Sequence, residues 1–165
     1  MKTGGLRQAL GAASLALSVL SQPAQAAPGD KARVSNLSDV AFGTVTNLTT
    51  DQRSAQDVCV YSNSASGGYT VTATGSGAGA ALSLSSGAAE LPYEVEWSAQ
   101  PSSTVGTTLT AGSVTSGFVS SANNQNCSPG SGPTASLIVV LRASALGSAT
   151  TGSYTGTLTL VIEPL

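Results

Sequence analysis

Two glutamates spaced two positions apart are the residues best placed to do chemistry. Glu94 and Glu96 alternate with apolar residues in the segment Tyr93-Glu94-Val95-Glu96-Trp97. On a β-strand they project from one face about 6–7 Å apart, a spacing at which paired carboxylates can serve glycoside hydrolysis. No other acid or base accompanies them in a pocket that the sequence defines. We therefore expect a solvated strand face, with a hydrolase as the alternative.

Other arrangements that carry chemistry are lacking in the sequence. There is no histidine, which excludes Ser-His-Asp and Cys-His catalysis and removes the most common zinc ligand. The glycine-rich stretch 75–80 lacks the helix that a dinucleotide site requires, so we expect a loop there. Asp51, Arg53 and Asp57 share one polar segment, which we interpret as a loop with a local ion pair. The sequence thus favours a binding or structural protein over an enzyme, and it indicates no cofactor and no metal.

The N-terminus predicts export. Lys2 and Arg7 form a short basic region, residues 9–20 are an apolar run, and Ala24-Gln25-Ala26 is a small-x-small site with cleavage expected before Ala27. The alternative is a membrane anchor, but the run falls short of the ~20 apolar residues that a span needs. We therefore expect residues 1–26 to be a signal peptide, and the mature protein to pass through the periplasm to the cell surface or the medium without inserting into a membrane.

The two cysteines, Cys59 and Cys127, are expected to form a disulfide in an oxidising compartment. Two buried free thiols are the alternative. A bond between them would close a long loop and stabilise the fold by roughly 4 kcal/mol in the chain-entropy model.

Composition and charge narrow the choice of partners. Removal of residues 1–26 leaves 139 of the 165 residues, the size of one domain. Charged residues make up 8% of the chain, against roughly 25% in ordinary globular proteins. The net charge of −2 becomes −4 once Lys2 and Arg7 are lost, so nothing suggests nucleic acid or an anionic membrane as a partner. Such a weakly charged surface suits packing against copies or relatives of the chain, although it also suits a merely secreted protein.

After Ala27 the pattern is that of an all-β domain. Short β-rich runs are separated by Gly, Ser, Asn and Pro clusters, which predicts seven or eight strands in an immunoglobulin-like sandwich. Nine runs are candidates for these strands, and they lie at or near residues 40–45, 58–61, 69–73, 80–85, 93–97, 107–110, 117–120, 136–141 and 154–162. Only residues 27–38 and 121–133 look irregular.

Alternation within these runs predicts which side chains face inward. The expected core contains Phe42, Val71, Tyr93, Val95 and Trp97. In the final run, alternation places Tyr154, Leu158, Leu160 and Ile162 on the inner face.

Several motifs resemble one known family. They are Phe42-Gly43-Thr44, a strand with Cys59, Gly68-Tyr69-Thr70-Val71, and a final Gly152-Ser153-Tyr154 run continuing to Val161. In this order they resemble the spore coat protein U-type domain, which also forms subunits of archaic chaperone–usher pili. The segment 91–97 is similar to a central strand of pilins from the alternate chaperone–usher group. The resemblance covers most of residues 40–165.

The resemblance implies a pilin-like sandwich over residues 40–165 that lacks its last strand. Tyr154, Leu158, Leu160 and Ile162 would then border an acceptor groove, filled first by a periplasmic chaperone and later by a neighbouring subunit's N-terminal extension. It implies a structural or tip subunit of a surface fimbria, with an outer-membrane usher as a further partner and a role in adhesion or biofilm formation. A stand-alone secreted or coat-type domain of the same fold is the alternative.

The chain departs from the family pattern in two places. It has no cysteine ahead of the Phe-Gly motif, and the expected N-terminal arm, residues 27–39, is a poor donor strand. Ala32, Val34, Asn36 and Ser38 share one face of that arm while Leu37 points to the other. Either the arm is a weak donor, or the subunit occupies a position, such as a tip, where no donation is needed.

Overall fold

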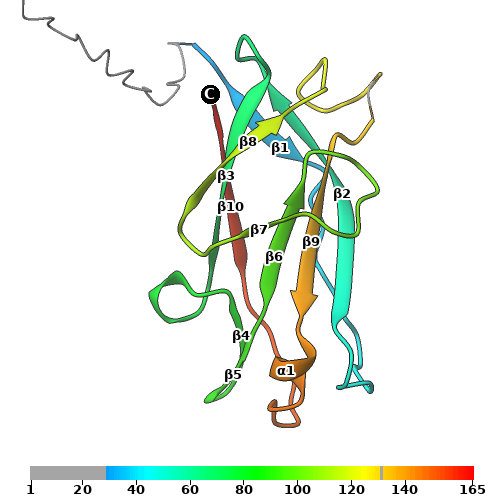
Figure 1. Cartoon of the computed structure of the whole chain (residues 1–165), viewed down its shortest axis with the longest axis vertical. Helices are drawn as coiled ribbons and strands as arrows, with labels where there is room; N and C mark the ends of the chain where they lie inside the picture. Colours follow the sequence, from blue (N-terminus) through cyan, green and yellow to red (C-terminus); the bar gives the residue numbers. More distant parts are fainter. Residues whose placement is uncertain (1–28, 131) are drawn as a thin grey trace, which may run out of the picture.

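Antiparallel strands are the main regular structure in a computed structural model, which describes residues 29–130 and 132–165 (Figure 1). The expected signal peptide lies outside the described residues. The strands are β1 (Ala32–Ser35), β2 (Gln52–Ser62), β3 (Gly68–Gly75), β4 (Ser83–Ser86), β5 (Ala89–Pro92), β6 (Glu94–Ser98), β7 (Thr107–Leu109), β8 (Val114–Val119), β9 (Ala135–Leu141) and β10 (Leu158–Pro164). A 3-10 turn spans Ala78–Ala80 and the helix α1 spans Ala143–Leu146. No helix in this part of the chain has the length and apolar character needed to cross a membrane.

The strands form the predicted β-sandwich. One sheet has the order β1-β2-β9-β6-β7, the other has the order β10-β3-β8, and β4 and β5 form a separate hairpin. Every strand pair is antiparallel, and the β4–β5 hairpin is closed by a turn of two residues. The expected all-β fold class is confirmed.

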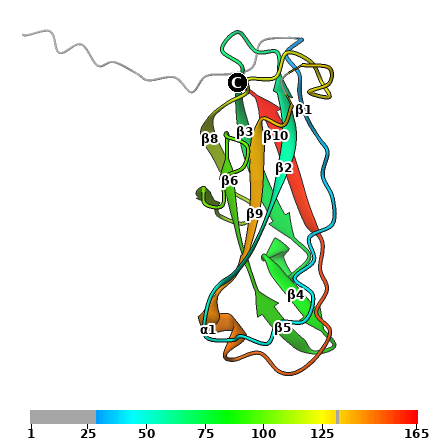
Figure 2. The same ribbon diagram turned by 90° about the vertical axis from the view of Figure 1, so that its right-hand side faces the viewer.

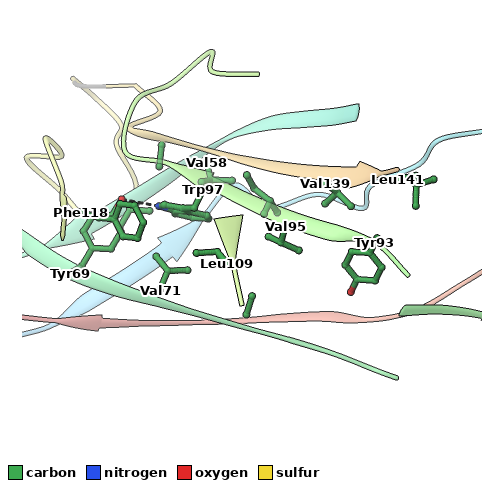
Figure 3. Close-up of a cluster of buried hydrophobic side chains, with 14 of the residues drawn as sticks. Val58, Tyr69, Val71, Tyr93, Val95, Trp97, Leu109, Phe118, Val139 and Leu141 are labelled. Atoms are coloured by element: carbon green, nitrogen blue, oxygen red, sulfur yellow. Dashed lines mark hydrogen bonds between the residues drawn. The ribbon is translucent and has the colours of Figure 1, made fainter. Parts of the chain in front are cut away.

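The core lies between the two sheets (Figure 3). All seven residues of β9 are buried, as its continuous apolar sequence predicts for a central strand. The largest buried side chain is Trp97, whose indole Nε1–H donates to the Tyr69 hydroxyl at 3.1 Å. The rings of Tyr69 and Phe118 lie 5.7 Å apart, so aromatic packing fills this end of the core.

Four of the five expected core residues are buried. Val71, Val95 and Trp97 have no exposed surface and Tyr93 is 6% exposed. Phe42 differs, because it is only partly buried and packs against the edge of the core.

The segment containing Phe42 is not the strand that its sequence predicts. Residues 40–45 have no regular secondary structure, and in the described chain no backbone–backbone hydrogen bond joins them to another segment. Gly43 adopts a φ of 64°, which breaks the extended conformation in the middle of the run. Val40, Phe42 and Val45 nevertheless pack against the core, so apolar character here indicates contact without strand pairing.

Three other expectations about local structure are wrong. Ala32–Ser35, expected to be irregular, pair with Cys59–Ser62 as an edge strand, although Val34 is their only large apolar residue. The polar segment with Arg53 and Asp57 is the first half of β2 rather than a loop, because its backbone pairs with β9. The strand β5 and the helix α1 were not expected, since both are too short for a clear periodic pattern.

The disulfide joins β2 to the loop that precedes β9. Cys59 and Cys127 are bonded, with their Cα atoms 5.8 Å apart and 68 positions apart in the sequence. Cys59 is fully buried and Cys127 is 4% exposed, so the bond ties an irregular segment to the core.

Trp97 should report directly on the packing of this core. Trp97→Ala should lower the free energy of unfolding by about 3–5 kcal/mol, because it leaves a large cavity beside Tyr69 and Leu109. Trp97→Phe keeps most of the volume and loses only the bond to Tyr69, so its cost should be clearly smaller. Urea denaturation followed by circular dichroism measures both. Native fluorescence with the emission maximum of free tryptophan would contradict the burial of Trp97.

The disulfide should contribute substantially to stability. Cys59→Ser should lower the free energy of unfolding by about 4 kcal/mol, because the unfolded chain loses the constraint of a closed loop. Mass spectrometry of non-reduced peptides from exported protein should recover the Cys59–Cys127 pair. Alkylation of both thiols without prior reduction would show that the bond is absent.

Candidate functional site: the open edge of β10

Within the described residues, the strand β10 is paired along one edge only. It runs antiparallel to β3 from Leu158 opposite Gly75 to Pro164 opposite Tyr69, with no shift in register. The Leu165 amide donates to the Gly68 carbonyl at 3.0 Å. Since bonded and non-bonded positions alternate in an antiparallel ladder, residues 159, 161 and 163 also bond to β3. The backbone groups of Leu158, Leu160 and Ile162 therefore point away from β3, towards the open edge.

The same three residues carry the inward-facing side chains of β10. Leu158, Leu160 and Ile162 are half-buried, whereas Thr159, Val161 and Glu163 between them are exposed. The three side chains pack against the core but are not covered as the residues of β9 are. We call Leu158, Leu160 and Ile162 the open-edge residues, because each combines a partly exposed apolar side chain with unpaired backbone groups.

The neighbourhood of this edge contains other partly covered apolar residues. The strands β1 and β10 lie close together without pairing, and Figure 2 shows the chain beyond β1 descending on the same side of the molecule as β10. Val34 of β1 and Val40, Phe42 and Val45 beyond it are partly buried against the core. Like the open-edge residues, they pack against the core and are only partly buried.

The other sheet edges are less suited to accept a strand. The strand β7 has three residues and β1 has four. The pairing of β8 with β3 shifts register between Tyr69 and Val71 of β3. Gly117, within β8, has a φ of 94°. Bulges of this kind distort an edge and oppose further pairing. The strand β10 is the one edge strand of the described sandwich that is long and regular, although Pro164, which has no N–H, limits pairing at its end.

Tyr154, the fourth residue predicted for this site, lies outside β10. Thr155 exchanges two backbone hydrogen bonds with Ser85, and the amide of Thr157 donates to the Ser76 hydroxyl at 3.0 Å. Before β10 begins at Leu158, the chain is therefore bonded first to the β4–β5 hairpin and then to the residue that follows β3. The Tyr154 hydroxyl donates to the Thr150 carbonyl at 2.9 Å, so its ring fastens the preceding loop.

The two glutamates of the sequence-based acid pair are held by arginines. Glu96 is 4% exposed, and its carboxylate accepts two hydrogen bonds of 3.0 Å from the Arg53 guanidinium and one of 3.0 Å from the Gly106 amide. Its expected solvation was wrong, because the loop between β6 and β7 lies over it. The Arg53 hydrogen bonds hold the pKa of Glu96 below its usual value of 4.5, with further support from Gly106.

A second arginine extends this network. The Arg142 guanidinium donates to Glu94 and, at 2.7 Å, to Asp51, and it lies 3.7 Å from Glu96. The contact with Glu94, followed by that with Asp51, raises the pKa of Arg142. The Ala143 amide, followed by the Arg142 guanidinium, lowers the pKa of Asp51. The lowered pKa values keep Glu96 and Asp51 ionised beside their arginines, which suits a structural network better than general acid catalysis.

Asp57 holds the loop between β6 and β7 against the outer face of the larger sheet. Its carboxylate accepts from the Ser102 amide at 2.6 Å and from the Ser136 hydroxyl at 2.9 Å. The Ser102 amide is the main cause of its lowered pKa. These partners could not be predicted from the sequence, because Arg53 meets Glu96, and Asp57 meets Ser136, only through the pairing of β2, β9 and β6.

Comparisons with known proteins support the fold. No family model matches the chain, and no curated protein sequence matches it. A solved structure described as a chaperone–tip adhesin complex, vital for synergistic activation of CFA/I fimbriae biogenesis, contains a chain of similar fold. The TM-score is 0.51 at 13% sequence identity, and the match covers 84% of this chain and 43% of that one. This chain thus spans less than half of its structural neighbour.

The charged network should make stability depend on pH. The pKa values of Glu96, Asp51 and Asp57 are all lowered in the folded protein. Their contribution to the free energy of unfolding is therefore complete at any pH above the pKa values of the unfolded chain, which lie near 4. It is lost as the pH falls through the lower folded values. We expect a nearly constant melting temperature from pH 7 to about pH 5 and a steep decline below about pH 4.

Glu96→Gln should lower the free energy of unfolding at pH 7 by about 1–3 kcal/mol. It should also make the fall in melting temperature at acid pH smaller, because one of the titrating carboxylates is gone. Glu94→Gln is the matched control on the same strand face, because the Glu94 side chain is 39% exposed against 6% for Glu96. Melting curves between pH 3 and pH 7 provide the test. Equal effects of the two substitutions would contradict the role given to Glu96.

Proposed function

We propose that this chain is an exported, non-enzymatic subunit of a surface fimbria of the chaperone–usher type. Its open-edge residues accept a strand from a periplasmic chaperone and then from another subunit, with assembly at an outer-membrane usher and a role in adhesion or biofilm formation. The observation that carries the proposal is the edge of β10, where Leu158, Leu160 and Ile162 have both unpaired backbone groups and partly exposed apolar side chains.

Addition of a strand would both pair the free backbone groups of this edge and cover its apolar side chains. An added strand supplies backbone donors and acceptors along β10, and its alternate apolar side chains cover the open-edge residues and the neighbouring Phe42 and Val34. Such an edge left uncovered favours aggregation. A partner that supplies a strand therefore stabilises the domain and keeps it soluble.

Two further observations support a fimbrial setting. The N-terminal sequence predicts export, and the Cys59–Cys127 bond suits an oxidising compartment. The structural neighbour belongs to a complex described as that of a fimbrial chaperone and a tip adhesin. The order of the Phe42-Gly43-Thr44, Gly68-Tyr69-Thr70-Val71 and Gly152-Ser153-Tyr154 motifs supports a spore coat protein U-type subunit within this class.

The proposal is tested by closing the edge covalently. A strand of alternating valine and threonine, fused after Leu165 through a short flexible linker, should make the mature domain monomeric and raise its melting temperature by roughly 10 °C, the effect of about 3 kcal/mol. A fused strand with aspartate in place of valine is the control and should give no gain. Light scattering and calorimetry measure the two effects.

Two substitutions in β10 locate the effect of the added strand. Leu160→Ala removes an inward contact and should reduce the gain from the fused strand, whereas Val161→Ala on the outer face should leave it unchanged. An unfused domain that is already monomeric and cooperative, and that gains nothing from fusion, would overturn the proposal. A stand-alone secreted sandwich would then be the better account.

A further inference from the structure

The N-terminal segment of the mature chain is part of its own sandwich. The residues of β1 pair with β2 from Ala32 opposite Ser62 to Ser35 opposite Cys59. Ahead of them, the Lys31 carbonyl accepts from the Asn63 amide at 3.1 Å, and the Lys31 amide donates to the Asn63 side chain. The chain is therefore attached to its own sheet from Lys31 onward.

Release of β1 would disturb the fold. Val34 packs against the core, and the opposite residues Val60 and Cys59 are fully buried. Cys59 also carries the disulfide to Cys127. Withdrawal of β1 would thus uncover apolar side chains beside the bond that stabilises the domain.

Cleavage at the predicted site before Ala27 would leave four residues, Ala-Pro-Gly-Asp, ahead of Lys31. A strand that covers the open-edge residues must span Leu158 to Ile162 and present apolar side chains at alternate positions. Proline lacks an N–H, glycine lacks a side chain, and aspartate is charged, so this sequence meets neither requirement.

We propose that this subunit accepts a strand but cannot donate one, and that it therefore terminates the assembly in which it takes part. The inference rests on the proposed function and on cleavage before Ala27. A protomer with both an open edge and a spare strand adds copies head to tail without limit, whereas a protomer with only the open edge forms one such contact and stops growth. Its partner is a single donor subunit, and the chain occupies one end of the assembly.

The test uses a donor protein whose own edge is closed. This donor is the mature chain with a strand fused after Leu165 and a second alternating valine–threonine strand placed ahead of Ala27. Mixed with the unmodified mature chain, it should form a heterodimer that does not grow. Native mass spectrometry counts the chains in each species and also determines the N-terminus of exported protein, expected at Ala27.

Two variants make the result decisive. The mature chain with an added N-terminal strand and an open edge should form long polymers, which shows that the assay detects growth. Deletion of residues 27–30 from the unmodified chain should change nothing. Assemblies with several unmodified chains that disappear on this deletion would overturn the inference, as would a mature N-terminus far upstream of Ala27. Failure of the donor to form any heterodimer would instead overturn the proposed function itself.

Discussion

The backbone groups of a sheet edge need partners, and in this molecule the longest regular edge has none within the described chain. The positions of β10 that bond to β3 alternate with positions that point outward, and the latter are Leu158, Leu160 and Ile162. Their side chains pack against the core and are only partly buried. One added strand would supply hydrogen-bond partners for these backbone groups and would also cover these side chains, because its own side chains alternate between the two faces of the sheet.

The rest of the sandwich is held together by contacts that do not involve that edge. The strand β9 is buried along its whole length, Trp97 is bonded to Tyr69, and the Cys59–Cys127 bond fastens a long loop to β2. On the outer face, Arg53 and Arg142 link β2, β6 and the end of β9 through Glu96, Glu94 and Asp51. Little of the molecule's ordering thus depends on the open side, which suits a domain that receives its last contacts from a partner.

The sequence predicted the parts of the fold that depend on local patterns. Alternation in residues 93–97 placed Trp97 inside, and the continuous apolar run of β9 indicated a central strand. The failures have a common cause, because they depend on pairing between distant segments. The ion pair of Arg53 with Glu96 requires the register across β9, and residues 40–45 have no strand partner within the described chain. Tyr154 precedes the point where the chain joins β3. Of the candidate site, alternation identified Leu158, Leu160 and Ile162 by their side chains, and only the register of β10 with β3 reveals their open backbone groups.

Amide hydrogen exchange along β10 measures whether the outer edge of this strand is open. In the mature domain alone, the amides of Leu158, Leu160 and Ile162 should exchange quickly, while those of Thr159, Val161 and Glu163, bonded to β3, should be protected. Addition of a complementary strand should protect the first set and leave the second unchanged. Strong protection of all six amides in the unaccompanied domain would show that the edge is already paired, and would contradict the account.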